Sequence, residues 1–169
     1  DDAIQGTWER VDPIPTSVDG QPVQPGDDHT PSPGALCFVT ANGLYGAAVD
    51  AKDVDGGRTT LLTPVFHLGD ATSAVVGYWR WYNNHLGANP SQDWWDVDVT
   101  ADGENWVHLE HTTASANSWN QFTFDLEDFV PLTGQIRVRF VAQDTGANSL
   151  LEAAVDDITL SAVRAPATD

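Results

Sequence analysis

Cysteine, methionine and lysine are nearly absent from this chain of 169 residues, which has one cysteine, no methionine and one lysine. A single cysteine excludes an intramolecular disulfide, and a chain of this length can bury a sizeable core without one. Cys37 lies in a short apolar run, which predicts a small buried side chain rather than a nucleophile. The sequence also lacks a signal-like apolar run and any apolar stretch of about 18 residues, so we expect no membrane insertion by a helix.

Basic residues are scarce as well, with seven Lys and Arg against 25 Asp and Glu and a net charge of −18. Such a surface repels the phosphates of nucleic acids and anionic membranes, so neither is expected as a partner. Twenty of the acidic residues are Asp and only five are Glu. Asp favours turns and binds hard cations, whereas Glu is typical of helix surfaces. The composition predicts an all-β extracellular protein, although a salty habitat would leave the same acidic signature.

Segments rich in aromatic and β-branched residues recur along the chain and are separated by turn formers, a pattern typical of strands. The predicted strands are Ala35–Thr40, Thr59–Leu68, Ala74–Tyr82, Trp94–Thr100, Trp106–His111, Trp119–Asp125, Gln135–Gln143 and Ala153–Val163. Asp102 and Gly103 predict a hairpin turn, and residues 126–130 predict a single helical turn before Pro131. This spacing favours a jelly-roll β-sandwich of two antiparallel sheets over an alternating α/β fold.

We predict a single module over residues 1–169, in three parts. Residues 1–34 are loop-rich, because six of the ten prolines lie between Val11 and Gly34, and so long a loop needs contacts that pin it. Residues 35–163 carry the sandwich strands, and residues 164–169 have the composition of a linker. Since the sequence has no initiator Met, we expect a processed or excised piece of a longer protein.

Alternation along the strands predicts which side chains enter the core. The predicted inward sets are Ile136, Val138 and Phe140; Phe122, Phe124 and Leu126; and Trp95, Val97 and Val99. The third set leaves Trp94, Asp96 and Asp98 on the outer face of their strand.

Aromatic residues are concentrated in two segments, 77–84 and 93–99, which hold four of the seven tryptophans and two of the three tyrosines. Only half of the rings on a strand can enter one core, so the others lie beside charged and amide groups. Such a mixture suits a flat polar ligand such as a sugar; the alternative is that both faces are covered and every ring is core. The predicted stacking residues are Trp79, Trp81, Tyr82 and Trp94, and the predicted hydrogen-bonding residues are Arg80, Asn83, Asn84 and Asp93.

Two adjacent carboxylates, Asp156 and Asp157, interrupt the last predicted strand. Neighbours in a strand point to opposite faces unless a bulge intervenes, so at least one of the two needs a partner that offsets the burial of its charge. An Arg could do this, or a calcium ion that also takes oxygens from the loop after Asp53. We predict a structural Ca²⁺ ion near Asp157, with ligands drawn from Asp27, Asp28, Asp53, Asp55, Asp156 and Asp157. Solvated turns or capping roles are the alternative for several of these carboxylates.

Signs of catalysis are weak. The run from His108 to His111 lacks the His-Glu-x-x-His order of zinc proteases. In a regular strand these two positions face opposite sides, so we do not expect them to share a metal. Asp96, Asp98 and Glu152 would suit glycoside hydrolysis only if the fold brought them together. We therefore predict that the chain is not an enzyme.

Six stretches together resemble a known group of modules: Gly6–Pro13, Pro25–Pro31, Cys37–Thr40, Asp53–Leu61, Tyr78–Tyr82 and Glu152–Ile158. They are similar to the MAM-like, carbohydrate-binding-module-like jelly-roll domains appended to secreted zinc carboxypeptidases and subtilisin-like proteases. The resemblance covers nearly the whole chain and implies calcium ligands in the Asp156-Asp157 pair and in the loop from Asp53 to Gly57. Related modules carry a further strand upstream of Trp8, and an open edge there would invite strand addition from another chain.

These observations predict a non-catalytic, calcium-stabilised accessory module that is secreted or held at the cell surface. Its expected partner is a polysaccharide or a cell-surface glycan, beside a parent catalytic domain. The first alternative is a structural module completed by strand exchange with a neighbouring subunit. The second is a jelly-roll hydrolase or lyase.

Overall fold

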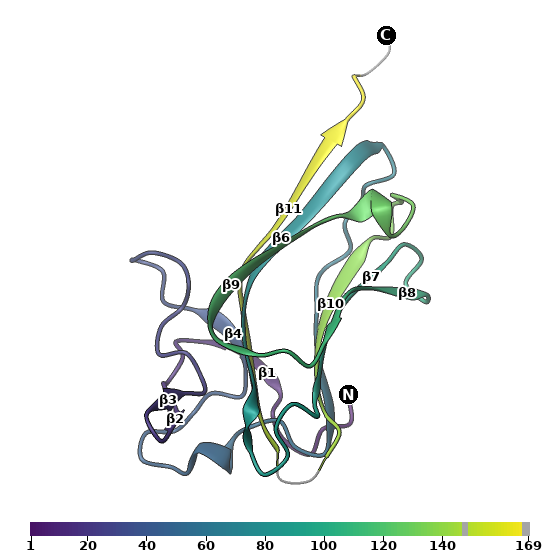
Figure 1. Cartoon of the computed structure of the whole chain (residues 1–169). Helices are drawn as coiled ribbons and strands as arrows, with labels where there is room; N and C mark the ends of the chain where they lie inside the picture. The colour runs from purple at the N-terminus through teal and green to yellow at the C-terminus, as the bar shows by residue number, and fades with distance from the viewer. Residues whose placement is uncertain (147–148, 167–169) are drawn as a thin grey trace.

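The computed structural model describes residues 1–146 and 149–166, and its strands form two antiparallel sheets packed face to face (Figure 1). One sheet has the order β1-β4-β11-β6-β9 and the other the order β5-β10-β7-β8. The strands of the five-stranded sheet are β1 (Trp8–Val11), β4 (Cys37–Thr40), β6 (Ala71–Gly87), β9 (Ala116–Asp125) and β11 (Ser149–Arg164). Those of the four-stranded sheet are β5 (Gly57–Leu62), β7 (Trp94–Thr100), β8 (Trp106–Thr112) and β10 (Arg137–Asp144). The predicted jelly-roll sandwich is confirmed.

Each of the eight predicted strands corresponds to an observed one, and β7 agrees at both ends. The predicted helical turn is a short 3₁₀ helix, η2 (Leu126–Asp128), and a second one, η1 (Val49–Ala51), was not predicted. Three short strands were also missed: β1 and the hairpin formed by β2 (Ser17–Val18) and β3 (Gln21–Pro22). Segments of two to four residues are too short to show a periodic pattern.

The main core lies between the two sheets. Its largest fully buried side chains include Tyr78 and Tyr82 from β6, Trp95 from β7 and Phe140 from β10. The inward sets predicted for β7 and β10 are confirmed as fully buried. In the remaining set, Phe122, Phe124 and Leu126, the leucine is buried, while the two phenylalanines are partly exposed and pack against the core.

The N-terminal segment before β4 covers part of the outer face of the five-stranded sheet (Figure 1). Beneath it, Cys37, Val39, Trp81 and Ala154 form a second buried cluster, which confirms the prediction that Cys37 is a small buried side chain. The Nε1 atom of Trp81 donates a hydrogen bond to the carbonyl of Val23 at 2.6 Å. The proline-rich segment is therefore pinned to the sheet by the contacts that its length requires.

The edge strands of the five-stranded sheet are β1 and β9. Completion of the β1 edge by a strand from another chain stays a prediction, as does the division of residues 1–169 into the three parts given above. Within the described residues, no helix has the length and hydrophobicity needed to cross a membrane.

Candidate functional site

The outer face of the four-stranded sheet gathers polar and aromatic side chains that the chain itself leaves uncovered. Along β7, Trp95, Val97 and Val99 enter the core with no exposed surface, so Trp94 and Asp96 point outward. The alternation predicted for this strand is confirmed. On the neighbouring β10, Arg139 lies on the same outer face, where its Nε atom donates to Asp98 Oδ2 at 2.7 Å.

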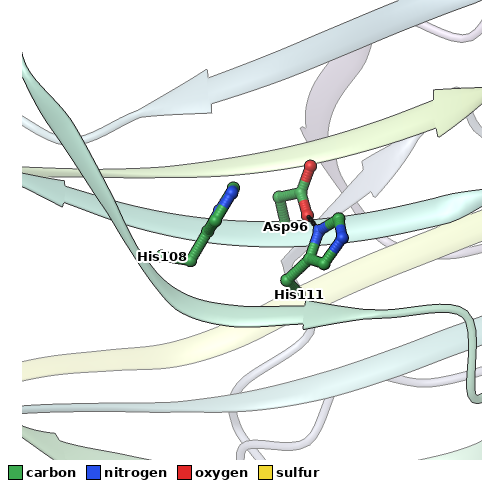
Figure 2. Close-up of side chains that lie close together, drawn as sticks. All are labelled: Asp96, His108 and His111. Carbon is green, nitrogen blue, oxygen red and sulfur yellow. Dashed lines mark hydrogen bonds and ion pairs between the residues drawn. The ribbon is translucent and has the colours of Figure 1, made fainter.

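A β-bulge in β8 adds two histidines to this face. Val97 pairs with Glu110 and Asp98 pairs with His108, so Leu109 is an extra residue with no partner of its own. Leu109 and Glu110 both point inward, and His108 and His111 both point outward from the same side (Figure 2). The prediction that these two histidines face opposite sides is wrong, because strict alternation holds only for a strand without a bulge.

The histidines and two aspartates of β7 form a compact polar cluster. His111 Nδ1 lies 2.5 Å from Asp96 Oδ1 (Figure 2), and His108 Nδ1 lies 2.6 Å from Asp98 Oδ1. The two imidazole rings are nearly parallel, with centroids 4.8 Å apart. Asp98 is almost fully buried and is also held by Arg139, so the cluster rests on a fixed carboxylate.

Two partly exposed tryptophans border the cluster. The Trp94 ring stacks on His111 with centroids 4.1 Å apart and an interplanar angle of 6°. Trp106, from the start of β8, lies under the Arg139 guanidinium at 4.3 Å. The sequence analysis selected Trp94 but not Trp106, His108, His111 or Arg139, because it sought binding residues only in the two segments where aromatic residues are concentrated.

Next to the cluster lies a polar groove of about 280 Å³. Its lining residues are Asp1, Arg58, Thr60, Asp96, Asp98, His108, Arg139, Val141 and Gln143. Carboxylate, guanidinium, amide and imidazole groups offer both donors and acceptors at fixed positions. This face can therefore bind a ligand rich in hydroxyl groups.

Most of the predicted binding residues lie inside the protein. Six of the eight are buried: Arg80, Trp81, Tyr82, Asn83, Asn84 and Asp93. The side chains of Tyr82 and Asn84 both donate to the backbone carbonyl of Asp93, and Asn83 donates to the carbonyl of Leu150. They support the turns of the sandwich, and in this structure they offer no surface for stacking.

Arg80 has a structural partner across the core. It forms an ion pair with Glu110 of β8, and both side chains are largely buried. Tyr78 Oη and Trp95 Nε1 donate to the same carboxylate at 2.7 and 3.0 Å. This ion pair links the two sheets across the core. The sequence pattern of a single strand cannot indicate such a contact.

Trp79 lies on the outer face of the other sheet, beneath the N-terminal segment. His29 stacks on its ring with centroids 3.6 Å apart. His29 Nδ1 in turn lies 2.9 Å from Asp157 Oδ2. One face of Trp79 is thus occupied by the chain itself.

The carboxylates proposed as metal ligands fall into two separate groups. In the first, a bulge follows Asp156, and Asp157 adopts a φ of +48°. Asp156 accepts hydrogen bonds from the backbone amides of His29 and Thr30, and Asp157 accepts one from the Thr30 hydroxyl at 2.7 Å. Hydrogen bonds from His29 and Thr30 hold the pKa of Asp157 below its ordinary value. Donors from the protein itself therefore already stabilise the carboxylates of Asp156 and Asp157.

The charged form of nearby Asp28 is destabilised by its surroundings. Burial and the charge of Asp156 raise the pKa of Asp28 above its ordinary value, and Asp27 adds to the shift. The cavity beside these residues, about 610 Å³, is lined by Asp28, Arg10 and apolar side chains that include Phe38.

The second group contains Asp53 and Asp55 together with Glu152, which was not among the predicted ligands. Asp53 and Glu152 are each only 1% exposed, and each has one carboxylate oxygen without a hydrogen-bond partner. Burial raises the pKa of Asp53 to about 7, with Asp55 adding to the shift. Burial, and then the charge of Asp53, raise the pKa of Glu152 well above its ordinary value.

This second group lies apart from the first. Glu152 and Asp156 are four residues apart along β11, which corresponds to roughly 13 Å of extended strand. Buried carboxylate oxygens without a hydrogen-bond partner are candidate ligands for a hard cation.

The catalytic alternative required Asp96, Asp98 and Glu152 to converge. Asp96 and Asp98 lie on the outer face of the four-stranded sheet, whereas Glu152 is buried in β11 of the other sheet. The three carboxylates do not meet, and the geometry that glycoside hydrolysis needs is not formed by them.

No protein-family model matches the chain, and no curated protein matches it. Several solved structures are similar at low identity. A family 61 carbohydrate-binding module in complex with β-1,4-galactotriose is 12% identical, with a TM-score of 0.48 over 95% of this chain and 85% of that chain. The K3 cleaved adhesin domain of Lys-gingipain from Porphyromonas gingivalis W83 is 17% identical, with a TM-score of 0.45 over 95% of each chain. A family 4 carbohydrate-binding module is 17% identical, with a TM-score of 0.40 over 92% and 94%.

Proposed function

We propose that this chain is a non-catalytic carbohydrate-binding module and that its glycan lies on the outer face of the four-stranded sheet. The observation that carries the proposal is the pair of partly exposed rings, Trp94 and Trp106, beside a polar groove. An aromatic ring offers a broad apolar surface at low entropic cost, which suits the C–H face of a sugar. Arg58, Asp96 and Gln143 line the groove and can pair with hydroxyl groups.

The acidic surface and the single cysteine are compatible with an extracellular setting, and we propose that the module is secreted or attached to the cell surface beside a catalytic domain. Its role there would be to hold that enzyme on a polysaccharide. The other outer face is a weaker candidate, because Trp81 is buried there beneath the N-terminal segment.

Affinity electrophoresis against a panel of polysaccharides tests the proposal. We expect at least one glycan to retard the wild-type chain, and Trp94→Ala to weaken its affinity for that glycan at least about fivefold, which corresponds to a loss of about 1 kcal/mol, since tryptophans are enriched among the residues that dominate binding energy. Trp79→Ala is the matched control, because it removes a tryptophan from the covered face. Absence of retardation by every glycan, or equal retardation of wild type and Trp94→Ala, would refute the proposal.

We also propose that Ca²⁺ stabilises the module at the second carboxylate group, with Asp53, Asp55 and Glu152 as the protein ligands. The support is the pair of buried oxygens on Asp53 and Glu152 that have no hydrogen-bond partner. A bound Ca²⁺ ion would supply the positive charge that these buried carboxylates otherwise lack. Asp156 and Asp157 are omitted from this set, because donors from the N-terminal segment already occupy them.

A further inference from the structure

The β8 bulge places two imidazoles and one carboxylate within reach of a single ion. Ligand-capable atoms of Asp96, His108 and His111 all lie within 4.8 Å of one another (Figure 2). Ligands of a tetrahedral zinc ion, with bonds of about 2.0 to 2.1 Å, lie about 3.4 Å apart. Since both histidines are exposed at the surface, small rotations of their side chains can close the remaining distance.

The surroundings orient these ligands. When His108 Nδ1 donates its proton to Asp98, the lone pair is left on Nε2, where a metal can bind. Asp98 is nearly fully buried and is held in place by Arg139. Trp94 stacks on the His111 ring and limits its rotation about the sheet face. A carboxylate behind a metal-ligating histidine is the arrangement that fixes ring orientation in protein metal sites.

We propose that Asp96, His108 and His111 form a binding site for a divalent transition-metal ion such as Zn²⁺. The ion takes the place of the proton between Asp96 Oδ1 and His111 Nδ1 and is joined by a ring nitrogen of His108. The displaced proton passes to solvent, as expected when a metal replaces hydrogen at a ligand. Three protein ligands leave a further coordination position open to water or to another ligand.

The alternative is two independent surface pairs, His108 with Asp98 and His111 with Asp96. The two interpretations differ in one respect: only a shared metal site makes the two histidines depend on each other for Zn²⁺ affinity. The site is also distinct from the proposed Ca²⁺ site, which offers oxygen ligands alone. Mixed nitrogen and oxygen donors favour zinc and its neighbours over Ca²⁺.

Isothermal titration calorimetry tests the site on the full chain, with Zn²⁺ as the titrant and no glycan present. Excess Ca²⁺ in the buffer occupies sites made of oxygen atoms alone. We expect saturable binding of Zn²⁺ by the wild type. His108→Ala and His111→Ala should each weaken it by more than the roughly 10- to 100-fold loss typical of removing a group that only orients a metal ligand.

His67→Ala and His85→Ala are matched controls, because both replace exposed histidines outside the cluster. We expect both to bind Zn²⁺ like the wild type, and thermal melts should show all four variants folded. Absence of Zn²⁺ binding by the wild type, unchanged affinity in His108→Ala and His111→Ala, or an equal loss in His85→Ala would overturn the proposal. Because no glycan takes part, none of these results depends on the proposed function.

Discussion

Asp157 shows how a single carboxylate fastens the N-terminal segment to the sandwich. It accepts hydrogen bonds from His29 and from the Thr30 hydroxyl, and its neighbour Asp156 accepts the backbone amides of the same two residues. The paired aspartates thus act as acceptors for a segment that is distant in sequence. The sequence correctly indicated that the pair needed partners, but it could not indicate that backbone amides would supply them.

We predict that Asp157→Asn destabilises the protein by about 1 kcal/mol at pH 7, an estimate reduced for the partial exposure of this side chain. The pKa of Asp157 is lower in the folded state than its value of 3.8 in the unfolded chain. The ionised Asp157 side chain therefore stabilises the fold fully at pH values above 3.8. This contribution to the free energy of unfolding is lost as the pH falls through the pKa that Asp157 has in the folded state. Urea unfolding at pH 7 and at about pH 3 should therefore show that the difference in unfolding free energy between wild type and variant narrows on acidification.

Asp128→Asn, at an exposed carboxylate in η2, is the control and should change little. A gap between wild type and Asp157→Asn that persisted or widened at low pH would show that the Asp157 charge does not hold the segment.

At the scale of elements, the bulge in β8 determines what each face of the four-stranded sheet can do. The extra residue turns Glu110 inward to Arg80 and leaves His108 and His111 together on the outer face. A regular strand would place one histidine on the core side and would let only one of Leu109 and Glu110 point inward. The same local irregularity therefore supports both the core and the outer surface.

We predict that Glu110→Ala destabilises the protein by about 3 to 5 kcal/mol, because it leaves the buried Arg80 guanidinium unpaired. Tyr78 Oη and Trp95 Nε1 lose their acceptor at the same time. Chemical denaturation measures the loss. Glu104→Ala, at an exposed site in the preceding turn, is the control and should stay within about 0.5 kcal/mol of wild type. An equally small effect for Glu110→Ala would mean that the inter-sheet ion pair contributes nothing.

The sequence predicted the elements better than it predicted the site. Alternation of apolar residues located β7 and assigned its faces correctly, because burial on one side leaves a direct trace in the pattern. Bulges leave no such trace, since they change the facing of a residue without changing its type. The proline-rich segment shows no periodicity either, although its Val23 is fully buried. Trp81 was therefore predicted as exposed, although this segment covers it, whereas Tyr82 lies on the opposite side of β6 in the main core beside Trp95.

At the scale of the whole molecule, the two outer faces of the sandwich are not equivalent. The N-terminal segment packs on part of the five-stranded sheet's outer face, whereas the four-stranded sheet carries Trp94, Trp106, the groove and the histidine cluster on its outer face. This asymmetry follows from where residues 12–34 pack, which is a property of the complete fold.

The proposed calcium site also acts at this scale, because Asp53 lies in the loop before β5 and Glu152 in β11. We predict that Ca²⁺ raises the melting temperature at pH 7.5 relative to EDTA by several degrees, since a bound ion offsets the buried charges. Asp53→Asn should reduce this difference, and Asp27→Asn should leave it intact. An identical melting temperature in Ca²⁺ and EDTA would contradict the proposal.

The central claim is that a glycan binds the outer face of the four-stranded sheet. The most direct test adds a glycan that retards the chain in affinity electrophoresis and follows the NMR shifts of the backbone amide and indole N–H groups. We predict that the largest changes fall on the indole N–H groups of Trp94 and Trp106 and on the Arg139 side chain, with Trp79 and Trp81 unaffected. Changes confined to Arg10, Phe38 and their neighbours in the cavity beneath the N-terminal segment would contradict the account and move the binding site to the other sheet.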